Sequence, residues 1–256
     1  MTTAAIIQAR MSSTRLPGKV LLDIAGHPML WHVVRRARKA RLVDRVVVAT
    51  SDRPEDDSIE AFCRQGHVDC FRGDESDVLD RFYGAARAFH AQVVVRLTAD
   101  CPMLDPGVID RVVAAYRRGG LDYVSNSVDR TYPDGLDTEV FSFVALERAW
   151  REARWTSERE HVTPYIWKHP ELFRVSAVRQ EVDLSAVRWT VDEVADLEFA
   201  RAAYRHFGTR DFGMQEMLAL LREQPRLADI NAGRTVNEGY EKSLREDALL
   251  EPGDQR

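Results

Sequence analysis

Short apolar runs alternate with stretches of helical periodicity along the first half of the chain. Residues 4–8 form an apolar run that stops at a polar loop, which is typical of a strand buried on both faces. From 28 to 40 the apolar residues recur at helical spacing, and the four basic residues between 35 and 39 predict a solvated face. The same reasoning predicts strands at 45–50, 69–72, 92–97 and 123–126, and helices beginning at Pro54 and covering 77–90 and 106–118. This alternation implies right-handed βαβ units around a mostly parallel sheet, with ligands at the carboxyl ends of its strands.

The pattern changes after Ser127. Residues 129–135 are rich in turn-forming types. Beyond them the pattern predicts strands at 136–141, 173–179 and 187–191, and helices at 143–153, 157–168, 193–207 and 213–223. We therefore expect an α/β fold of three layers, with a mostly parallel central sheet and a substrate-facing insertion in the second half. The expected single domain covers 1–245, and the charged residues 246–256 are expected to be a frayed tail.

The composition is that of an ordinary globular protein, with 45% apolar and 30% charged residues. The net charge of −5, from 36 basic and 41 acidic residues, argues against nucleic acid as a main partner. No stretch approaches the roughly 20 apolar residues that a membrane span needs, and the N-terminus does not resemble a signal peptide. The three cysteines lack zinc or redox spacing and suit a reducing compartment. We expect a cytoplasmic protein without a membrane or nucleic-acid partner.

The segment from Gln8 to Lys19 concentrates positive charge in a chain of negative net charge. It reads Gln-Ala-Arg-Met-Ser-Ser-Thr-Arg-Leu-Pro-Gly-Lys and contains Arg10 and Arg15, with no acid between positions 1 and 22. Arginine forks, an ammonium, hydroxyls and backbone N–H groups at a strand's carboxyl end are the groups that wrap a polyphosphate. The spacing is neither a Walker A loop nor a G-x-G-x-x-G turn, so neither an ATPase nor a dehydrogenase is indicated. The alternative is a solvated loop whose arginines pair with surface carboxylates.

Two aspartates follow predicted strands at the edge where a ligand is expected. Asp100 comes soon after the strand at 92–97, and Asp192 follows the strand at 187–191. A bound triphosphate needs a divalent cation that is usually held by one or two carboxylates, so these residues are candidate ligands. The alternatives are a turn residue before Pro102 for Asp100, and a helix cap for Asp192.

Other polar residues carry weaker signals. The carboxylates between 74 and 80 suit a helix N-terminus. Arg81 could reach a nucleotide or pair with Asp77 one turn away. His161 lies beside charged residues on a predicted helix, where it could contact a substrate or be a surface histidine. The sequence shows no His/Cys set for zinc and no nucleophile-elbow spacing for a hydrolase triad.

Seven segments carry a resemblance to a known family. They are Gln8–Leu21, Val48–Asp52, Asp77–Tyr83, Leu97–Pro102, Tyr132–Phe141, Arg159–Tyr165 and Arg188–Asp192. In this order they resemble the cytidylyltransferases that make CMP-activated acidic sugars, in particular the SpsF-like spore coat polysaccharide biosynthesis proteins, which are related to the CMP-Kdo and CMP-sialic acid synthetases. The resemblance implies a nucleotide-diphospho-sugar transferase fold, which is Rossmann-like. It also implies a reaction in which an NTP and an acceptor give an NMP-acceptor and pyrophosphate.

The resemblance also implies roles for particular residues. Mg²⁺ is the implied cofactor, and its implied ligands are Asp100 and Asp192. The implied catalytic set adds three cations that hold the triphosphate and the leaving pyrophosphate: Arg10, Arg15 and Lys19. The implied nucleotide pocket comprises Gln8, Ala9, Arg10, Ser13, Arg15, Lys19, Ser51, Asp80, Arg81, Thr98 and Asp100. The residues implied to face the acceptor are Asp137, Glu139, Arg159, Glu160 and His161.

The same resemblance divides the expected domain by role. Residues 1–127 are the implied nucleotide-binding half, 128–192 the acceptor-binding and dimerisation region of a homodimer, and 193–245 the C-terminal helices. The CMP-sugar synthetases carry a base-defining glutamine near the position of Leu97 or Thr98, and this chain does not. CTP is therefore the expected nucleotide on the strength of the other segments, with another NTP as the alternative.

The acceptor is expected to be small and acidic: an acidic sugar, a sugar phosphate or a phosphonate. An ionised acceptor oxygen needs no base, whereas a sugar hydroxyl would need one, with Glu160 or His161 as candidates. Two other classes of protein remain as alternatives. A glycosyltransferase of the same fold would typically show an Asp-x-Asp motif, which is absent from Asp100 to Asp105. A non-catalytic nucleotide-binding module would be expected to have lost one of the residues that hold phosphate or metal.

Overall fold

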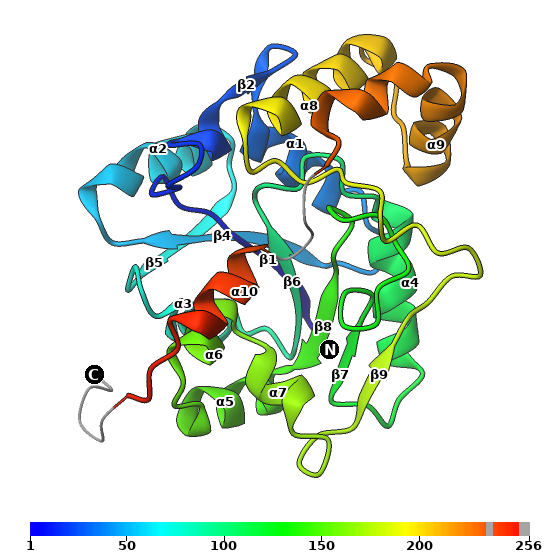
Figure 1. Ribbon diagram of the computed structural model, residues 1–256. Helices are drawn as coiled ribbons and strands as arrows, with labels where there is room; N and C mark the ends of the chain where they lie inside the picture. The colour runs from blue at the N-terminus through cyan, green and yellow to red at the C-terminus, as the bar shows by residue number, and fades with distance from the viewer. Residues whose placement is uncertain (234–237, 251–256) are drawn as a thin grey trace.

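The structure is a computed structural model that describes residues 1–233 and 238–250. Within these residues a seven-stranded sheet lies at the centre, in the order β5-β4-β1-β6-β8-β7-β9 (Figure 1). Its strands are β1 (Thr3–Gln8), β4 (Arg45–Ser51), β5 (Asp69–Gly73), β6 (Val93–Thr98), β7 (Tyr123–Ser125), β8 (Glu139–Ser142) and β9 (Val175–Ala177). A separate hairpin pairs β2 (Asp23–Ile24) with β3 (His27–Pro28).

Most of the sheet is parallel. Strand β1 pairs in parallel with β4 and β6, β4 with β5, and β7 with β9. Strand β8 lies between β6 and β7 and runs antiparallel to both. The expectation of a mostly parallel sheet is confirmed.

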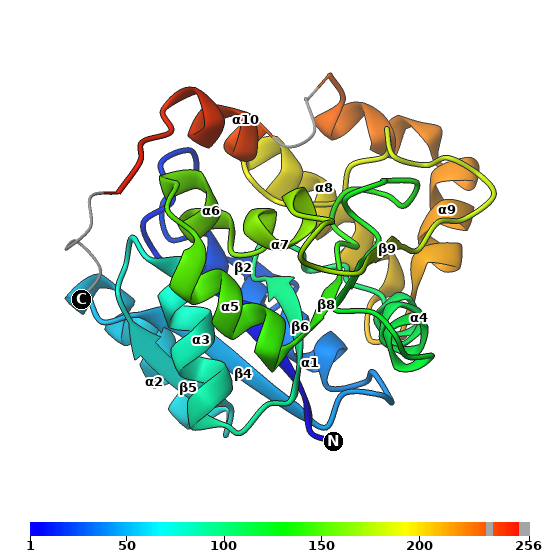
Figure 2. The same cartoon turned by 90° about the horizontal axis from the view of Figure 1, so that it is seen from below.

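Helices cover both faces of the sheet, because alternate residues of each strand point to opposite sides. On β1, Ala5 and Ile7 pack with one layer, and Ala4 and Ile6 with the other. The first layer contains α1 (Met29–Ala37), α2 (Asp57–Gln65) and α4 (Pro106–Arg117). The second contains α3 (Val78–Ala88), α5 (Phe143–Glu152) and α7 (Pro164–Lys168), and Figure 2 shows α3 and α5 opposite α4. The predicted three layers are confirmed.

A third hydrophobic cluster lies beside the sheet. Helices α8 (Val194–Phe207) and α9 (Met214–Glu223) surround the buried Trp189, together with Tyr132 and Leu136. Trp189 and Val191, which precede Asp192 in the chain, belong to this cluster. The remaining helical segments are α6 (Thr156–His161), α10 (Glu238–Arg245) and 3-10 turns at Lys19–Leu21, Pro54–Asp56 and Pro225–Asn231. No helix in the described residues is long and apolar enough to cross a membrane.

Two predicted elements of the second half are wrong. The helix expected over 157–168 is two short helices, because Val162 has a φ of 71° and Pro164 has no N–H to donate. The segment expected to be a strand over 187–191 forms one isolated bridge, between Arg188 and Asp134. Its apolar side chains fill the third cluster instead of a sheet face.

The end of the chain also differs from the expectation. The sequence pattern does not predict α10. Residues 246–250 of the expected frayed tail are held against α6: the N–H of Thr156 donates to the Ala248 carbonyl (3.0 Å), and the N–H of Leu250 donates to the Arg154 carbonyl (2.9 Å). Residues 251–256 of that tail lie outside the described residues.

The basic side of α1 is not uniformly solvated. Arg36 is 7% exposed. Its guanidinium donates to the Tyr204 hydroxyl (3.0 Å) and to the carbonyl oxygens of Leu104 and Phe212 (both 2.9 Å). The expectation of a solvated basic face is therefore wrong at this position, because protein acceptors replace water around the buried guanidinium. Arg36 instead ties α1 to the third cluster.

Gly135 marks a close approach between the loop before β8 and the segment that leads to Asp192. Its φ is 102°, and a Cβ here would lie 2.6 Å from the backbone nitrogen of Thr190. The neighbouring Asp134 donates its N–H to the Val187 carbonyl (2.8 Å) and accepts from the N–H of Trp189 (2.7 Å). The two segments thus pack backbone against backbone, which requires glycine at this position.

We predict that Gly135→Ala lowers the free energy of unfolding by about 1–3 kcal/mol more than Gly26→Ala, because the added methyl must displace backbone. Gly26 has a similar φ of 86°, but nothing lies within 4 Å of its Cβ position. The control therefore carries only the conformational strain of about 1–2 kcal/mol. Urea unfolding of both variants measures the difference. Equal losses would mean that the loop moves to relieve the clash.

Candidate functional site

The carboxyl ends of three adjacent parallel strands form the floor of the site. Gln8 ends β1 and has Thr98 of β6 as its register partner. Ser51 ends β4 on the other side. Ala9 continues β1 by donating its N–H to the Ala49 carbonyl (3.0 Å). The structure thus brings four of the predicted nucleotide-pocket residues to one edge of the sheet.

The basic loop that follows β1 is folded back on itself. The carbonyl of Met11 accepts from the N–H groups of Ser13 (2.8 Å) and Gly18 (3.0 Å). The N–H of Met11 donates to Oδ1 of Asp56 (2.7 Å). The other oxygen of Asp56 accepts from the N–H (3.0 Å) and the hydroxyl (2.6 Å) of Ser51. Asp56 is 2% exposed, so a buried carboxylate fixes the start of the loop against β4.

Lys19 lies between the two predicted metal ligands. Its Nζ donates to Oδ2 of Asp100 and to Oδ1 of Asp192, both at 2.9 Å, and to the Val191 carbonyl at 2.9 Å. Arg15 forms an ion pair with the same Oδ1 of Asp192 at 3.0 Å. The loop cations therefore do pair with carboxylates, as the alternative interpretation held, but these partners are the predicted site aspartates. One ammonium joins two residues that were predicted from separate strand ends.

The charges at this point offset the effect of burial. Burial lowers the pKa of Lys19, but the attraction of Asp100 and Asp192 outweighs it, so this pKa is raised above its ordinary value. Burial raises the pKa of Asp100, while the charge and hydrogen bond of Lys19 and a hydrogen bond from Thr98 lower it to about 2. Both Lys19 and Asp100 are therefore charged at neutral pH.

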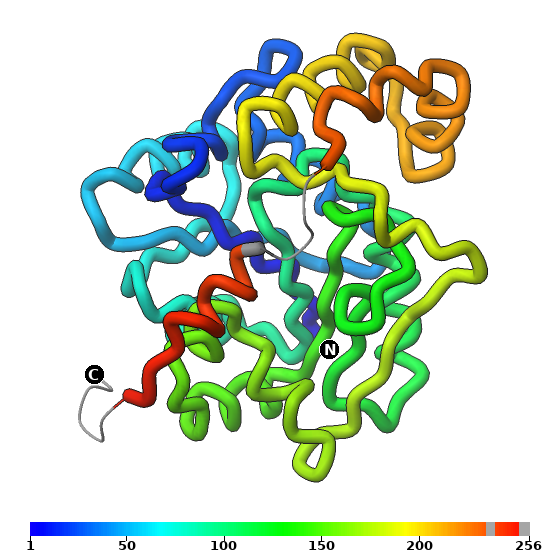
Figure 3. The backbone as a smooth tube through the Cα atoms, viewed as in Figure 1, coloured from blue at the N-terminus to red at the C-terminus, as the bar shows by residue number. Residues whose placement is uncertain are grey.

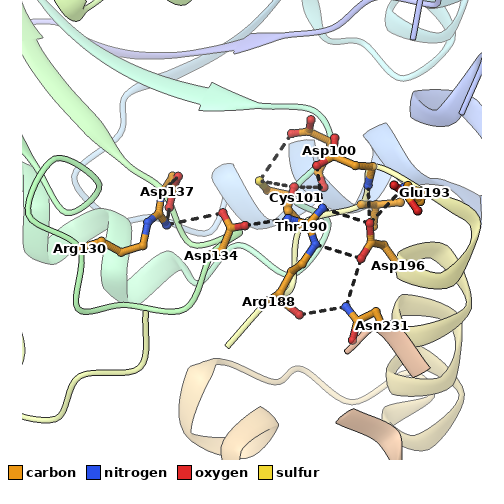
Figure 4. Close-up of polar contacts among 12 residues, drawn as sticks. Asp100, Cys101, Arg130, Asp134, Asp137, Arg188, Thr190, Glu193, Asp196 and Asn231 are labelled. Carbon is orange, nitrogen blue, oxygen red and sulfur yellow. Dashed lines mark hydrogen bonds and ion pairs between the residues drawn. The ribbon is translucent and has the colours of Figure 1, made fainter. Parts of the chain in front are cut away.

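Asp192 is fixed from its other side by Arg188, whose side chain is 9% exposed. The guanidinium donates to Oδ2 of Asp192 (2.8 Å) and to Asp134 (3.1 Å), as part of the polar cluster drawn in Figure 4. It also donates to both carboxylate oxygens of Asp196 (3.1 and 3.2 Å). Asn231 holds Asp196 in turn through its side-chain amide (3.2 Å). A network of buried charges therefore orients Asp192.

The alternative role of Asp192, as the cap of α8, is not observed. The N-cap position is Glu193. Asp196 accepts from the N–H groups of both Asp192 (2.9 Å) and Glu193 (3.0 Å). The carboxylate of Asp192 thus stays directed to the loop cations and Arg188.

Glu139 and Arg159, both expected to face the acceptor, are engaged within the fold. The carboxylate of Glu139 is 7% exposed and contacts Arg96 and the hydroxyls of Thr163 and Tyr123. Protein partners thus engage both carboxylate oxygens of Glu139, and its expected contact with an acceptor stays a prediction.

Arg159 is also buried, at 5% exposed, and its guanidinium is hydrogen-bonded to protein groups. It donates to Oδ2 of Asp77 (2.7 Å) and to the carbonyls of Trp150 (3.1 Å) and Ala153 (3.2 Å). The guanidinium holds α6 against α3 and the end of α5. These contacts give Arg159 a packing role, and its expected contact with an acceptor stays a prediction.

Asp137 is paired with Arg130 through both carboxylate oxygens, and its side chain is 27% exposed (Figure 4).

Glu160 and His161 lie between the basic loop and α10. Nη2 of Arg10 is 3.5 Å from Oε1 of Glu160. Burial, and next the charge of Arg96, lower the pKa of His161 to about 4, so its imidazole is neutral at pH 7.

The remaining nucleotide-pocket predictions fall in different surroundings. Arg81 is 1% exposed, and it donates to the Asp74 carbonyl (2.9 Å). Asp77, its suggested partner, instead caps α3 by accepting from the N–H of Asp80 (2.9 Å). Asp80 accepts from the Trp150 indole (2.8 Å), which places its carboxylate against α5. Ser13 stays within the loop, where its hydroxyl accepts from the N–H of Leu16 (3.3 Å).

Two buried polar atoms of the expected nucleotide pocket have no hydrogen-bond partner among the described residues. They are Oε1 of Gln8 and Nε of Arg81. An unpaired buried polar group costs about 1–3 kcal/mol. Gln8 ends β1 and Arg81 lies in the first turns of α3, and a ligand between them would supply the missing partners.

The residues around the Lys19 ammonium fit a divalent cation of the Mg²⁺ type. The carboxylates of Asp100 and Asp192 and the Val191 carbonyl are hard oxygen donors that already converge on one cation. No group of three or more His, Cys, Asp or Glu side chains within residues 1–233 and 238–250 could hold a metal ion. A metal bound here would therefore need phosphate oxygens or water molecules to complete its coordination.

Several supporting residues were not predicted from the sequence. Asp56, Asp196 and Asn231 act through the backbone or through another side chain, and no motif marks them. Arg188 belongs to one of the family segments, but its three carboxylate partners lie 4, 8 and 54 positions away from it in the sequence.

The comparison with known proteins decides the family. A family model described as cytidylyltransferase matches residues 4–224. The chain belongs to the cytidylyltransferase family. It is therefore an enzyme, a CTP-dependent nucleotidyltransferase, and the resemblance found in the sequence is confirmed.

Individual relatives agree with this assignment. The spore coat polysaccharide biosynthesis protein SpsF of Bacillus subtilis is 38% identical over 230 residues, which cover 86% of this chain and 94% of that protein. The 3-deoxy-manno-octulosonate cytidylyltransferase of Geobacter sulfurreducens is 41% identical over 150 residues, or 56% of this chain and 58% of that protein. A solved cytidylyltransferase structure from Leptospira borgpetersenii serovar Hardjo-bovis has a TM-score of 0.86 at 30% identity, with 93% of this chain and 100% of that chain covered.

We predict that Arg188→Met lowers the free energy of unfolding by about 3–5 kcal/mol, because the buried Asp134 and Asp196 and the partly buried Asp192 lose their shared counter-charge. Arg201→Met is the matched control, since Arg201 pairs with Glu198 on a more exposed surface (2.9 Å) and should cost at most about 1 kcal/mol. Chemical unfolding curves of both variants measure the difference. Similar losses would indicate that solvent screens the Arg188 cluster.

Proposed function

We propose that this cytidylyltransferase transfers CMP from CTP to a small acidic acceptor, with Mg²⁺ as cofactor and release of pyrophosphate. The acceptor class is an acidic sugar, a sugar phosphate or a phosphonate. The observation that carries the proposal is the convergence of Lys19 with Asp100 and Asp192, at 2.9 Å each, beside a preorganised basic loop. Retention of all three residues speaks against a non-catalytic module.

The loop and the strand ends would bind the nucleotide. Arg10 and Arg15 are 42% and 36% exposed, so their guanidinium groups can turn from their carboxylate partners to phosphate oxygens. The folded loop needs little reorganisation for this, since two backbone hydrogen bonds and one to the Asp56 carboxylate already fix the backbone of Met11. The orphaned Oε1 of Gln8 and Nε of Arg81 would find partners on the nucleoside.

Mg²⁺ bound by Asp100 and Asp192 would supply a Lewis acid for the α-phosphate. Lys19, which now neutralises these carboxylates, would be free to turn its ammonium to the triphosphate. Mg²⁺ would thus add positive charge to the site as the triphosphate adds negative charge. The net charge of the buried cluster would stay near zero.

The chemical step would be an in-line displacement at the α-phosphorus. An acceptor oxygen forms a bond to phosphorus while the bond from phosphorus to the bridging oxygen of the β-phosphate breaks, and the electron pair leaves with pyrophosphate. Arg10, Arg15 and Lys19 would stabilise the charge on the leaving group by their fixed positions. Glu160 and His161 are the acceptor-side candidates, because Glu160 pairs with Arg10 of the basic loop and His161 follows it on α6.

We predict pyrophosphate release when the protein is incubated with Mg²⁺, CTP and the correct acceptor from a panel of acidic sugars, sugar phosphates and phosphonates. The same panel with ATP, GTP and UTP tests the choice of base. Asp100→Asn should lower turnover about 10²–10³-fold, because it removes a charge that acts at the reacting phosphate.

The matched control is Asp211→Asn, at an exposed carboxylate that pairs with Lys39. This variant should keep full activity. Undiminished turnover by Asp100→Asn would dismiss the metal site, and absence of pyrophosphate with every nucleotide and acceptor would argue against the proposed reaction. The homodimer and the cytoplasmic location stay predictions.

A further inference from the structure

Helix α10, close to the C-terminus, reaches the acceptor side of the site. Helix α10, red in Figure 3, lies beside α6. The hydroxyl oxygen of Ser243 on α10 is 2.8 Å from Oε2 of Glu160 and 2.9 Å from Nε2 of His161. One side chain therefore contacts both acceptor-side candidates.

The hydrogen-bond pattern around Ser243 determines where the imidazole proton is. The Ser243 hydroxyl has one proton, and two acceptors lie within reach of it: Oε2 of Glu160 (2.8 Å) and the Gly239 carbonyl (3.0 Å). An ionised carboxylate and a carbonyl can only accept. The Ser243 oxygen must therefore accept from His161, so Nε2 of His161 carries the proton and Nδ1 carries the lone pair.

The charged groups around His161 largely cancel one another. They are Arg10 of the basic loop, Arg96 of β6, Glu139 of β8 and Glu160 of α6. Arg96 is paired with Glu139, and Arg10 with Glu160. Burial thus dominates, and it keeps the imidazole neutral.

Packing from α10 restricts the same ring. Tyr240 meets His161 edge to face, with 4.9 Å between ring centroids. Lys168 of α7 lies 5.6 Å above the Tyr240 ring. The tautomer and the orientation of the imidazole are therefore both set by α10.

We propose that Ser243 is a positioning residue for the acceptor side: its hydroxyl holds His161 and Glu160 so that Nδ1 of His161 is presented to a polar group of the acceptor. The proposal rests on the proposed function. It makes α10 part of the site, although this helix contributes no group to the phosphate loop.

The test compares Ser243→Ala with Ser243→Thr, which keeps the hydroxyl, and with Ser58→Ala, a control at an exposed helix serine of α2. Steady-state pyrophosphate release is measured with CTP and acceptor varied separately. Ser243→Ala should raise KM for the acceptor about three- to tenfold, the equivalent of one hydrogen bond. KM for CTP should stay unchanged, and Ser243→Thr should restore most of the loss. Equal changes for both substrates, no change, or failure of the threonine variant would overturn the proposal.

A second measurement separates this proposal from the proposed function. Nitrogen-15 NMR of the histidine ring reports the tautomer and pKa of His161 without any turnover. In the wild type the proton should be on Nε2, with a pKa of about 4. Ser243→Ala should shift the tautomer balance and raise this pKa, because water enters beside the ring. An unchanged His161 signal would overturn the positioning role, whether or not the wild type releases pyrophosphate.

Discussion

The arrangement of the site depends on one buried ammonium held between two carboxylates. Lys19 comes from the basic loop, Asp100 from the end of the central sheet, and Asp192 from the third cluster. Each of these charges would be costly to bury alone, and together they compensate one another. The three parts of the molecule therefore have to come together in one geometry for the charges to be satisfied.

The rest of the site extends this compensation outwards. Arg188 neutralises Asp192 from behind, Asp196 holds Arg188, and Asn231 holds Asp196. On the other side, Asp56 anchors the loop that carries the cations. Protein contacts alone thus hold these charged groups in place, and such fixed placement is the basis of electrostatic catalysis.

The sequence predicts the parts of the structure that depend on local pattern. The strands and helices of the first half follow from apolar periodicity, and the loop cations and site aspartates follow from their positions at strand ends. The pattern fails where tertiary contacts override it. Residues 187–191 look like a strand because they are apolar, but their side chains complete another core. Arg36 looks solvated because it is basic, but carbonyl oxygens from two distant segments surround it.

On the acceptor side, the sequence pattern predicts even fewer of the tertiary contacts. Glu139 and Arg159 lie in family segments, and nothing in their sequence reveals that protein partners engage them. Ser243 shows no signal at all, because its neighbours Glu160 and His161 are more than 80 positions away. Only the docking of α10 on α6 brings them together.

The placement of Asp100 and Asp192 on two different hydrophobic cores has a consequence for stability. Asp100 follows β6 of the central sheet, whereas Asp192 precedes α8, which packs with α9 in the third cluster. A ligand that bound both carboxylates would link the two cores. By thermodynamic linkage, its binding free energy would also stabilise the contact between them. Side chains that lie deep in the third cluster, such as Trp189, would then be coupled to the affinity for such a ligand through packing alone.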